Sequence, residues 1–256
     1  MNMKRYIALV AAFAAACLLH AATNTWTGAV NDWNWNEGGN YENGLPSAGD
    51  VVKIPAGPTA RILGTDSTSL GVINSLERII PISSNSVMEV VTDADHPVTL
   101  NIPVAWPVSK ESDPESGYGE VVKIGAGTLS LANTGPLAYC TSFTVREGAL
   151  RLPTGRSGTP YPYTRLSVSN NATLFTVGEA GYTFVRELLG SGLVTNDSSK
   201  ASYLQIWGGT PEAPVRVEAK LTPNVRYYQY GGVVDVLSTN NTMTAQFSAR
   251  RYPSTA

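Results

Sequence analysis

The sequence predicts an all-β fold, a right-handed single-stranded parallel β-helix, and three observations carry that prediction. Residues 121–131, 143–152 and 166–174 each alternate apolar and polar side chains, which is the pattern of short half-buried strands. These segments recur roughly every 20 to 25 residues, a period typical of one coil of a solenoid. Glycine, asparagine and proline separate them, as expected where a coil turns a corner.

Residues 1–22 are expected to be a signal peptide. Lys4 and Arg5 form a short positive region, and residues 7–19 are an apolar run that is short for a membrane span. Ala21 and Ala22 are small residues suited to cleavage. We therefore expect an exported protein, extracellular or at the cell surface in association with the outer membrane, and no membrane span in the mature chain. After cleavage Cys140 is the only cysteine, so the mature chain forms no intramolecular disulfide.

Residues 23–57 are expected to cap the N-terminal end of the β-helix. Trp26, Trp33, Trp35 and Tyr41 lie there among Asn, Gly and Asp, directly before the first predicted strand. Bulky aromatic rings can cover the open strand edge and bare core at the end of a solenoid. The same four residues are the candidate glycan-binding residues, because an aromatic face with a polar rim suits a pyranose ring. The cap is the favoured interpretation.

Residues 58–256 are expected to form the β-helix itself. Residues 58–120 hold irregular coils with candidate strands at 60–63, 71–76, 86–91 and 98–102, followed by a proline-containing acidic loop. Residues 121–196 form the first regular repeat, and residues 197–256 hold a second, degraded repeat. The period-two pattern points Val, Leu, Ile and Phe into a narrow core.

The regular repeat resembles a known family. Its opening carries Lys123, Gly125, Gly127, Thr128 and Leu129 in the order K-x-G-x-G-T-L, and its last part reads L-G-S-G-x-V-T-N over residues 189–196. Between them lie T-V-x-x-G-x-L-x-L over residues 144–152 and V-x-x-x-A-T-L over residues 168–174. This series is similar to the autotransporter-associated β-strand repeat of bacterial passenger domains. The resemblance implies a β-helical module displayed at a bacterial surface.

Charge and composition exclude some function classes. Only 15% of the residues are charged, and without Lys4 and Arg5 the acidic side chains outnumber the basic ones by four. The mature chain has no cluster of more than two adjacent basic residues, which argues against nucleic acid and against anionic membrane surfaces. No phosphate-binding glycine loop or nucleophile elbow is present, and no cofactor or metal is expected.

Two sets of residues offer alternatives to a purely structural protein. Asp93, Asp95 and Lys110 are the first candidates for a polysaccharide-degrading β-helix enzyme with calcium, although His96 and the two aspartates are typical of a turn. A second set could line a ligand groove or equally pack within strands: Tyr161, Tyr163, Tyr227, Tyr228 and Tyr230.

The sequence favours a non-enzymatic cell-surface or extracellular β-helical passenger, a stalk or adhesin-like module. Its expected partners are surface glycans or other cell-surface proteins. A polysaccharide-degrading or glycan-binding β-helix protein is the alternative.

Overall fold

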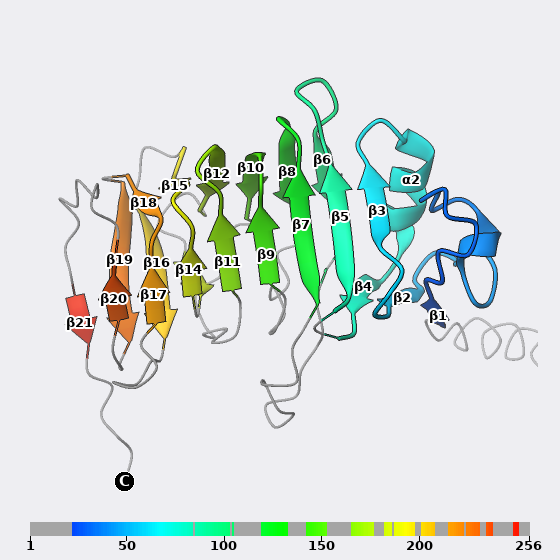
Figure 1. The fold of residues 1–256 in the computed structure, drawn as a ribbon, viewed down its shortest axis with the longest axis horizontal. Helices are drawn as coiled ribbons and strands as arrows, with labels where there is room; N and C mark the ends of the chain where they lie inside the picture. The colour runs from blue at the N-terminus through cyan, green and yellow to red at the C-terminus, as the bar shows by residue number, and fades with distance from the viewer. Residues whose placement is uncertain are drawn as a thin grey trace, which may run out of the picture.

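The protein is a parallel β-solenoid of about six turns with almost no helix (Figure 1). The computed structural model describes residues 22–83, 85–102, 104, 119–132, 142–152, 165–176, 182–185, 187–197, 201–207, 215–222, 224–230, 234–237 and 248–250. The predicted fold class is confirmed. The coils follow one another along the long axis, from the aromatic segment and helix at one end to β21 near the other (Figure 1).

The strands of the described residues belong to four parallel sheets, each built from one strand per coil. The first sheet contains β1 (Thr23–Thr25), β2 (Val51–Ile54) and β4 (Arg78–Pro81). The longest contains β3 (Ala60–Leu63), β5 (Val87–Val91), β7 (Glu120–Ile124), β9 (Ser142–Val145), β11 (Arg165–Val168), β14 (Glu187–Leu189), β17 (Val215–Val217) and β20 (Val234–Val236). Facing it are β6 (Val98–Leu100), β8 (Thr128–Leu131), β10 (Gly148–Arg151), β12 (Ala172–Phe175), β15 (Leu193–Thr195) and β18 (Lys220–Leu221). The fourth sheet contains β13 (Tyr182–Val185), β16 (Ser202–Trp207), β19 (Val225–Tyr230) and β21 (Ser248–Arg250).

The pairing register gives the length of a coil directly. Glu120 pairs with Ser142, Ser142 with Arg165, and Arg165 with Glu187, so equivalent positions lie 22, 23 and 22 residues apart. This spacing agrees with the predicted period.

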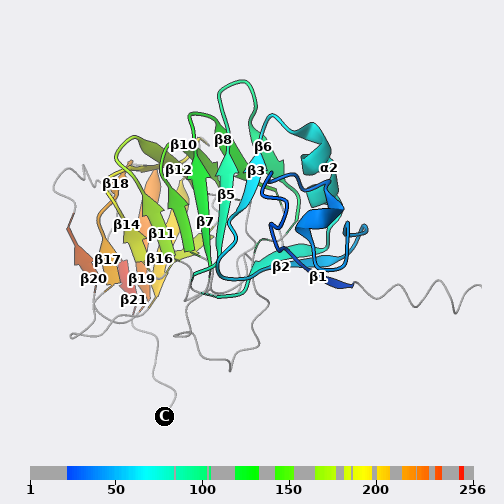
Figure 2. The ribbon, with the colours of Figure 1, turned by 45° about the vertical axis from the view of Figure 1, so that its right-hand side comes forward.

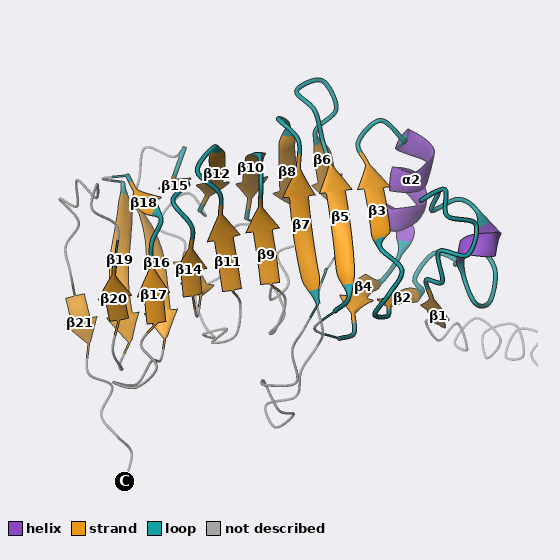
Figure 3. Ribbon diagram, in the orientation of Figure 1, coloured by secondary structure: helices purple, strands orange, loops and turns teal. Residues whose placement is uncertain are grey.

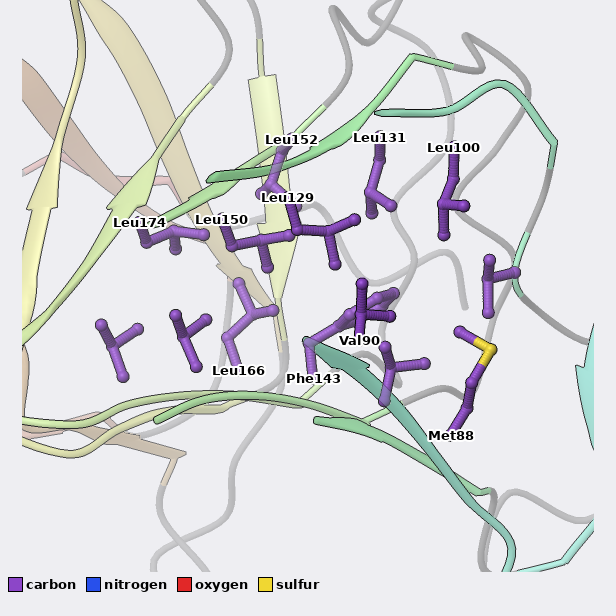
Figure 4. Packing of buried hydrophobic residues seen from close by; sticks show 14 of the residues in the cluster. Met88, Val90, Leu100, Leu129, Leu131, Phe143, Leu150, Leu152, Leu166 and Leu174 are labelled. Carbon is purple, nitrogen blue, oxygen red and sulfur yellow. The ribbon is translucent and has the colours of Figure 1, made fainter. Parts of the chain in front are cut away.

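The core is a stack of aliphatic rungs between the two longest sheets. Val121, Phe143, Leu166 and Leu188 follow one another along one sheet, and all four are buried. Leucines of the opposite sheet, Leu129, Leu150 and Leu174 among them, face this row across the interior (Figure 4). Burying one such side chain stabilises the fold by about 1.5–3 kcal/mol, so each coil depends on the neighbours that cover it.

Glycine is required at the corners because successive coils stack too closely for a Cβ atom. Gly125 has φ +85°, and a Cβ there would lie 2.0 Å from the carbonyl oxygen of Thr92 in the preceding coil. A Cβ on Gly127 would lie 1.9 Å from the carbonyl oxygen of Asp93. The predicted corner role therefore has two physical causes: both glycines allow the coils to approach closely, and Gly125 also adopts a positive φ.

The first coil departs from the predicted strand pattern. The expected strand at 71–76 is wrong, because α2 (Ser67–Ser75) occupies that side of the coil (Figure 3). Asp66 starts the helix by accepting a hydrogen bond from the Ser69 amide. The Asn74 side chain then accepts from the Asn101 amide at 2.8 Å and donates to the Thr99 carbonyl at 3.1 Å. Its amide group therefore supplies the backbone partners that a neighbouring strand would otherwise give to the open edge of β6.

Candidate functional site

Three of the four predicted aromatic residues form the core of the N-terminal segment. Trp26 and Trp35 are fully buried and Tyr41 is 5% exposed. The two indoles stack with centroids 4.8 Å apart, and the Tyr41 ring meets Trp26 edge-on at 5.2 Å. The Tyr41 hydroxyl donates to the Trp35 carbonyl at 2.9 Å, and burial raises the pKa of this phenol well above its usual value. These rings present no face to solvent, as a cap requires.

The cap also satisfies the edge of the longest sheet. The Trp35 indole N–H donates to the carbonyl oxygen of Arg61 in β3 at 2.9 Å. Because β3 is the first strand of that sheet, this carbonyl has no preceding strand to bind. A short helix η1 (Gly38–Asn40) turns the chain within the cap, which lies beside β1, β2 and α2 (Figure 2). The aromatic cluster agrees with the cap expected from the sequence.

Trp33 differs from the other three aromatic residues because it is only partly buried. Its backbone has φ +54°, a left-handed conformation rare for a bulky residue. The guanidinium carbon of Arg61 lies 4.2 Å from the Trp33 ring centroid. Arg61 in turn pairs with Glu89 through Nε at 2.7 Å and Nη2 at 2.5 Å, both to Oε2. Of the four predicted glycan-binding residues, Trp33 is therefore the one that is partly exposed.

The predicted acidic residues form a turn. The Asp93 carboxylate accepts from the amides of Asp95 and His96 at 2.9 and 2.8 Å, and it contacts His96 Nδ1 at 2.8 Å. The side-chain hydrogen bond with His96 is the largest effect and lowers the pKa of Asp93; desolvation opposes it, and the backbone hydrogen bonds from His96 and Asp95 lower the pKa further. Both partners are about half exposed. Lys110, the third member of the predicted catalytic set, lies outside the described residues. Among those residues no group of three or more metal-ligating side chains occurs.

The sequence pattern did not reveal the role of Lys123. This side chain is 1% exposed and belongs to the inward row of β7, between two valines of the adjacent coils. Its Nζ donates to the carbonyl oxygens of Ile124, Gly125 and Glu147 at 3.1, 2.6 and 3.0 Å. Desolvation lowers the pKa of Lys123 to about 8, and the charge of Glu147 opposes that shift. The lysine thus joins the corners of two successive coils.

Of the tyrosines predicted to line a groove, Tyr227 is the one whose side chain the structure describes. Tyr227 is fully buried, and burial raises the pKa of its phenol well above the usual value. The backbone register pairs Tyr228 with Gln205 and Tyr230 with Trp207. Tyr161 and Tyr163 lie outside the described residues.

The outward side chains of the coils are linked along the solenoid axis. Arg165 Nε lies 3.1 Å from Glu187 Oε2 of the next coil. Arg151 extends over the Phe175 ring of the next coil at 4.6 Å and pairs with Asp197 of the coil after that. Arg165 and Arg151 therefore form ion pairs and ring contacts that link successive coils.

Comparisons with known proteins give no relative. No protein-family model, no curated protein and no solved structure matches the chain. The helices of the described residues include none with the length and apolar character needed to cross a bilayer.

Proposed function

We propose that this protein is a non-enzymatic β-helical module displayed at the cell surface or in the extracellular space, a stalk or adhesin-like passenger. The observation that carries the proposal is a stack of parallel coils, regular in its central part, whose N-terminal end is closed by an aromatic cap. Such a stack grows in length by adding coils, and each coil needs only its neighbours for stability. Length and exposed outer faces suit display.

The use of the acidic residues supports a non-enzymatic role. Asp93 is engaged by two backbone amides and His96 within one turn, which accounts for the carboxylate without a substrate. Arg165 and Arg151 are paired with carboxylates of other coils. A polysaccharide-degrading enzyme needs two carboxylates, or a carboxylate with calcium and a base, that converge on one bond.

Kinship with the autotransporter-associated β-strand repeat is part of the proposal. Its support comes from the structural roles that the K-x-G-x-G-T-L residues take. Lys123 binds carbonyl oxygens of two corners, Gly125 and Gly127 allow the coils to approach, and Leu129 fills the core. Each motif position therefore has a reason to recur in every copy of a stacked coil.

Export and shape are tested together on the full chain. We expect expression of the full chain in a bacterium with two membranes to yield a protein whose N-terminus maps near Ala22 by mass spectrometry, outside the cytoplasm. About six coils spaced about 4.8 Å apart make a stack only about 30 Å long, so small-angle scattering from the purified product should fit this compact stack. A full-length precursor retained in the cytoplasm would remove the export proposal, and a profile that does not fit the stacked coils would remove the proposed module.

Enzymatic activity is tested with the same product. Incubation with pectin, alginate and sulfated glycans should release neither reducing nor unsaturated ends. Release that is lost on Asp93→Asn would replace the display function with polysaccharide cleavage.

A further inference from the structure

We infer that Trp33, Arg61 and Glu89 form a binding subsite for an uncharged hexopyranose unit of a surface polysaccharide. The inference names a ligand class for the display function proposed above, and it rests on that proposal for its biological setting. The site lies where the cap loop meets β3 and β5, at the N-terminal end of the outer face of the longest sheet.

The first argument is that Trp33 adopts a strained backbone conformation although its side chain does not join the buried core. Trp33 at φ +54° and Asn31 at φ +58° are both left-handed within three residues. Asparagine adopts this region readily, whereas a bulky residue there costs about 1–3 kcal/mol. Asp32 holds the conformation by accepting from the Asn34 amide at 3.0 Å and the Asn40 side chain at 2.7 Å. The loop is thus built to hold Trp33 outside the buried aromatic cluster, over Arg61.

The second argument is the set of hydrogen-bonding groups beside the indole. Arg61 uses Nε and Nη2 for Glu89, and both bonds end on Oε2. Across the described part of the chain, Arg61 Nη1 and Glu89 Oε1 make no hydrogen bond. A guanidinium donates through five N–H groups and a carboxylate oxygen accepts through two lone pairs. The site therefore offers one unused donor nitrogen, Arg61 Nη1, and one unused acceptor oxygen, Glu89 Oε1, next to an aromatic residue.

This combination matches the chemistry of a sugar. A pyranose with equatorial hydroxyl groups has an apolar face of axial C–H groups, which packs on an indole ring. Arg61 covers one face of the Trp33 ring, so a sugar unit can pack on the other face, while hydroxyls elsewhere on the polysaccharide, which both donate and accept, can bind Arg61 Nη1 and Glu89 Oε1. Replacement of bound water by these hydroxyls leaves neither side chain unpaired.

Charge selects neutral sugars over uronates and sulfated sugars. The positive charge of Arg61 is already paired with Glu89 at 2.5 Å, and Asp32 beside Trp33 adds an exposed negative charge. Hydrogen bonding from the Asn34 amide lowers the pKa of Asp32, so this carboxyl stays ionised. An acidic sugar on the indole would meet like charges, and Arg61, the cation over the ring, is already paired with Glu89.

The test is binding of the mature protein to a panel of neutral and acidic polysaccharides. Affinity electrophoresis and titration with β-1,4-linked glucose oligosaccharides should show binding of the neutral chains and weaker or no binding of pectin and alginate. Trp33→Ala should weaken neutral binding at least tenfold. Trp33→Phe keeps a ring over Arg61, so it should fold and bind with intermediate affinity, and the ligand-induced change in tryptophan fluorescence should disappear.

The matched control is Phe175→Ala. Phe175 also carries an arginine over its ring, at 4.6 Å, but it lies in an unstrained strand of another sheet. It should bind like wild type. The inference is overturned if wild type binds no neutral glycan, if Trp33→Phe retains the full fluorescence response, or if Phe175→Ala loses as much affinity as Trp33→Ala. None of these outcomes alters the stacked coils or the export on which the display function depends.

Discussion

Replacement of Gly125 by alanine tests the idea that close stacking at the corners holds the solenoid together. The residue has φ +85°, so an alanine there costs about 1–2 kcal/mol for the left-handed conformation alone. The new Cβ would lie 2.0 Å from the Thr92 carbonyl oxygen, whereas ordinary van der Waals contact begins at 3.4 Å. One coil therefore has to move away from the other.

That movement strains hydrogen bonds at the same corner. The Thr92 amide donates to the Ile124 carbonyl at 3.0 Å, and Lys123 Nζ donates to the Gly125 carbonyl at 2.6 Å. A buried polar group left without its partner costs about 1–3 kcal/mol. We expect Gly125→Ala to lower the free energy of unfolding by about 3 kcal/mol or more, which lowers Tm by roughly 6–12 °C in a domain of this size.

Urea denaturation and thermal unfolding followed by circular dichroism measure this loss, with Gly71→Ala as the matched control. Gly71 lies exposed in α2 with no atom within 4 Å of the added Cβ. Alanine there should stabilise the helix by about 0.5–1 kcal/mol. If Gly125→Ala stays within 1 kcal/mol of wild type, the corner relaxes easily and the close-stacking argument fails.

Three further substitutions test other contacts. Folding lowers the pKa of Lys123 from 10.5 to about 8. Between these pH values the lysine is protonated in the unfolded chain and neutral in the folded chain. The free energy of unfolding therefore rises with pH, by up to about 1.4 kcal/mol per pH unit. Lys123→Met should remove that rise. The measurement is the free energy of unfolding from denaturation curves recorded at pH 8 and pH 10.5, and an equal increase in wild type and Lys123→Met would contradict the assignment. Trp35→Phe should cost about 2–4 kcal/mol in urea denaturation, because it shrinks a buried ring and leaves the Arg61 carbonyl unpaired; an unchanged midpoint would show that the cap does not depend on this contact. His96→Ala should raise the pKa of Asp93 toward 3.8 in an NMR titration, since the His96 hydrogen bond is the main cause of the lowering. In wild type this contact stabilises the fold above pH 3.8, and the stabilisation is lost as the pH falls through the lowered pKa of Asp93 in the folded state. An Asp93 pKa that does not change in His96→Ala would refute the pairing.

The β-helix was predictable because its signals are local. Alternation in 143–152 puts Leu150 in the core whatever the rest of the chain does, and the spacing of such segments sets the coil length. The glycines at 125 and 127 likewise mark corners in the sequence. The helix over Ser67–Ser75 was missed, because its apolar residues also fit a strand and its start depends on the Asp66 cap.

The candidate site was likewise predictable only in part, because its residues could be named from the sequence but their contacts could not. The sequence identified four aromatic residues as one group, but it had no means of telling which rings lie inside. Trp26, Trp35 and Tyr41 are brought into contact by the path of the cap loop, whereas Trp33 is held over Arg61, 28 residues further along the chain. Glu89 joins them only because β5 pairs with β3 in register.

Residue pattern alone was enough to establish the repeating coil, its length and its aliphatic interior, since these follow from side chains that alternate every second residue. The inward lysine at 123, the closure of the first strand edge by Trp35 and the meeting of Trp33, Arg61 and Glu89 came from folding. Each joins residues of different coils or of the cap and a coil, and such contacts depend on register and on the path of the chain, which no short stretch of sequence contains.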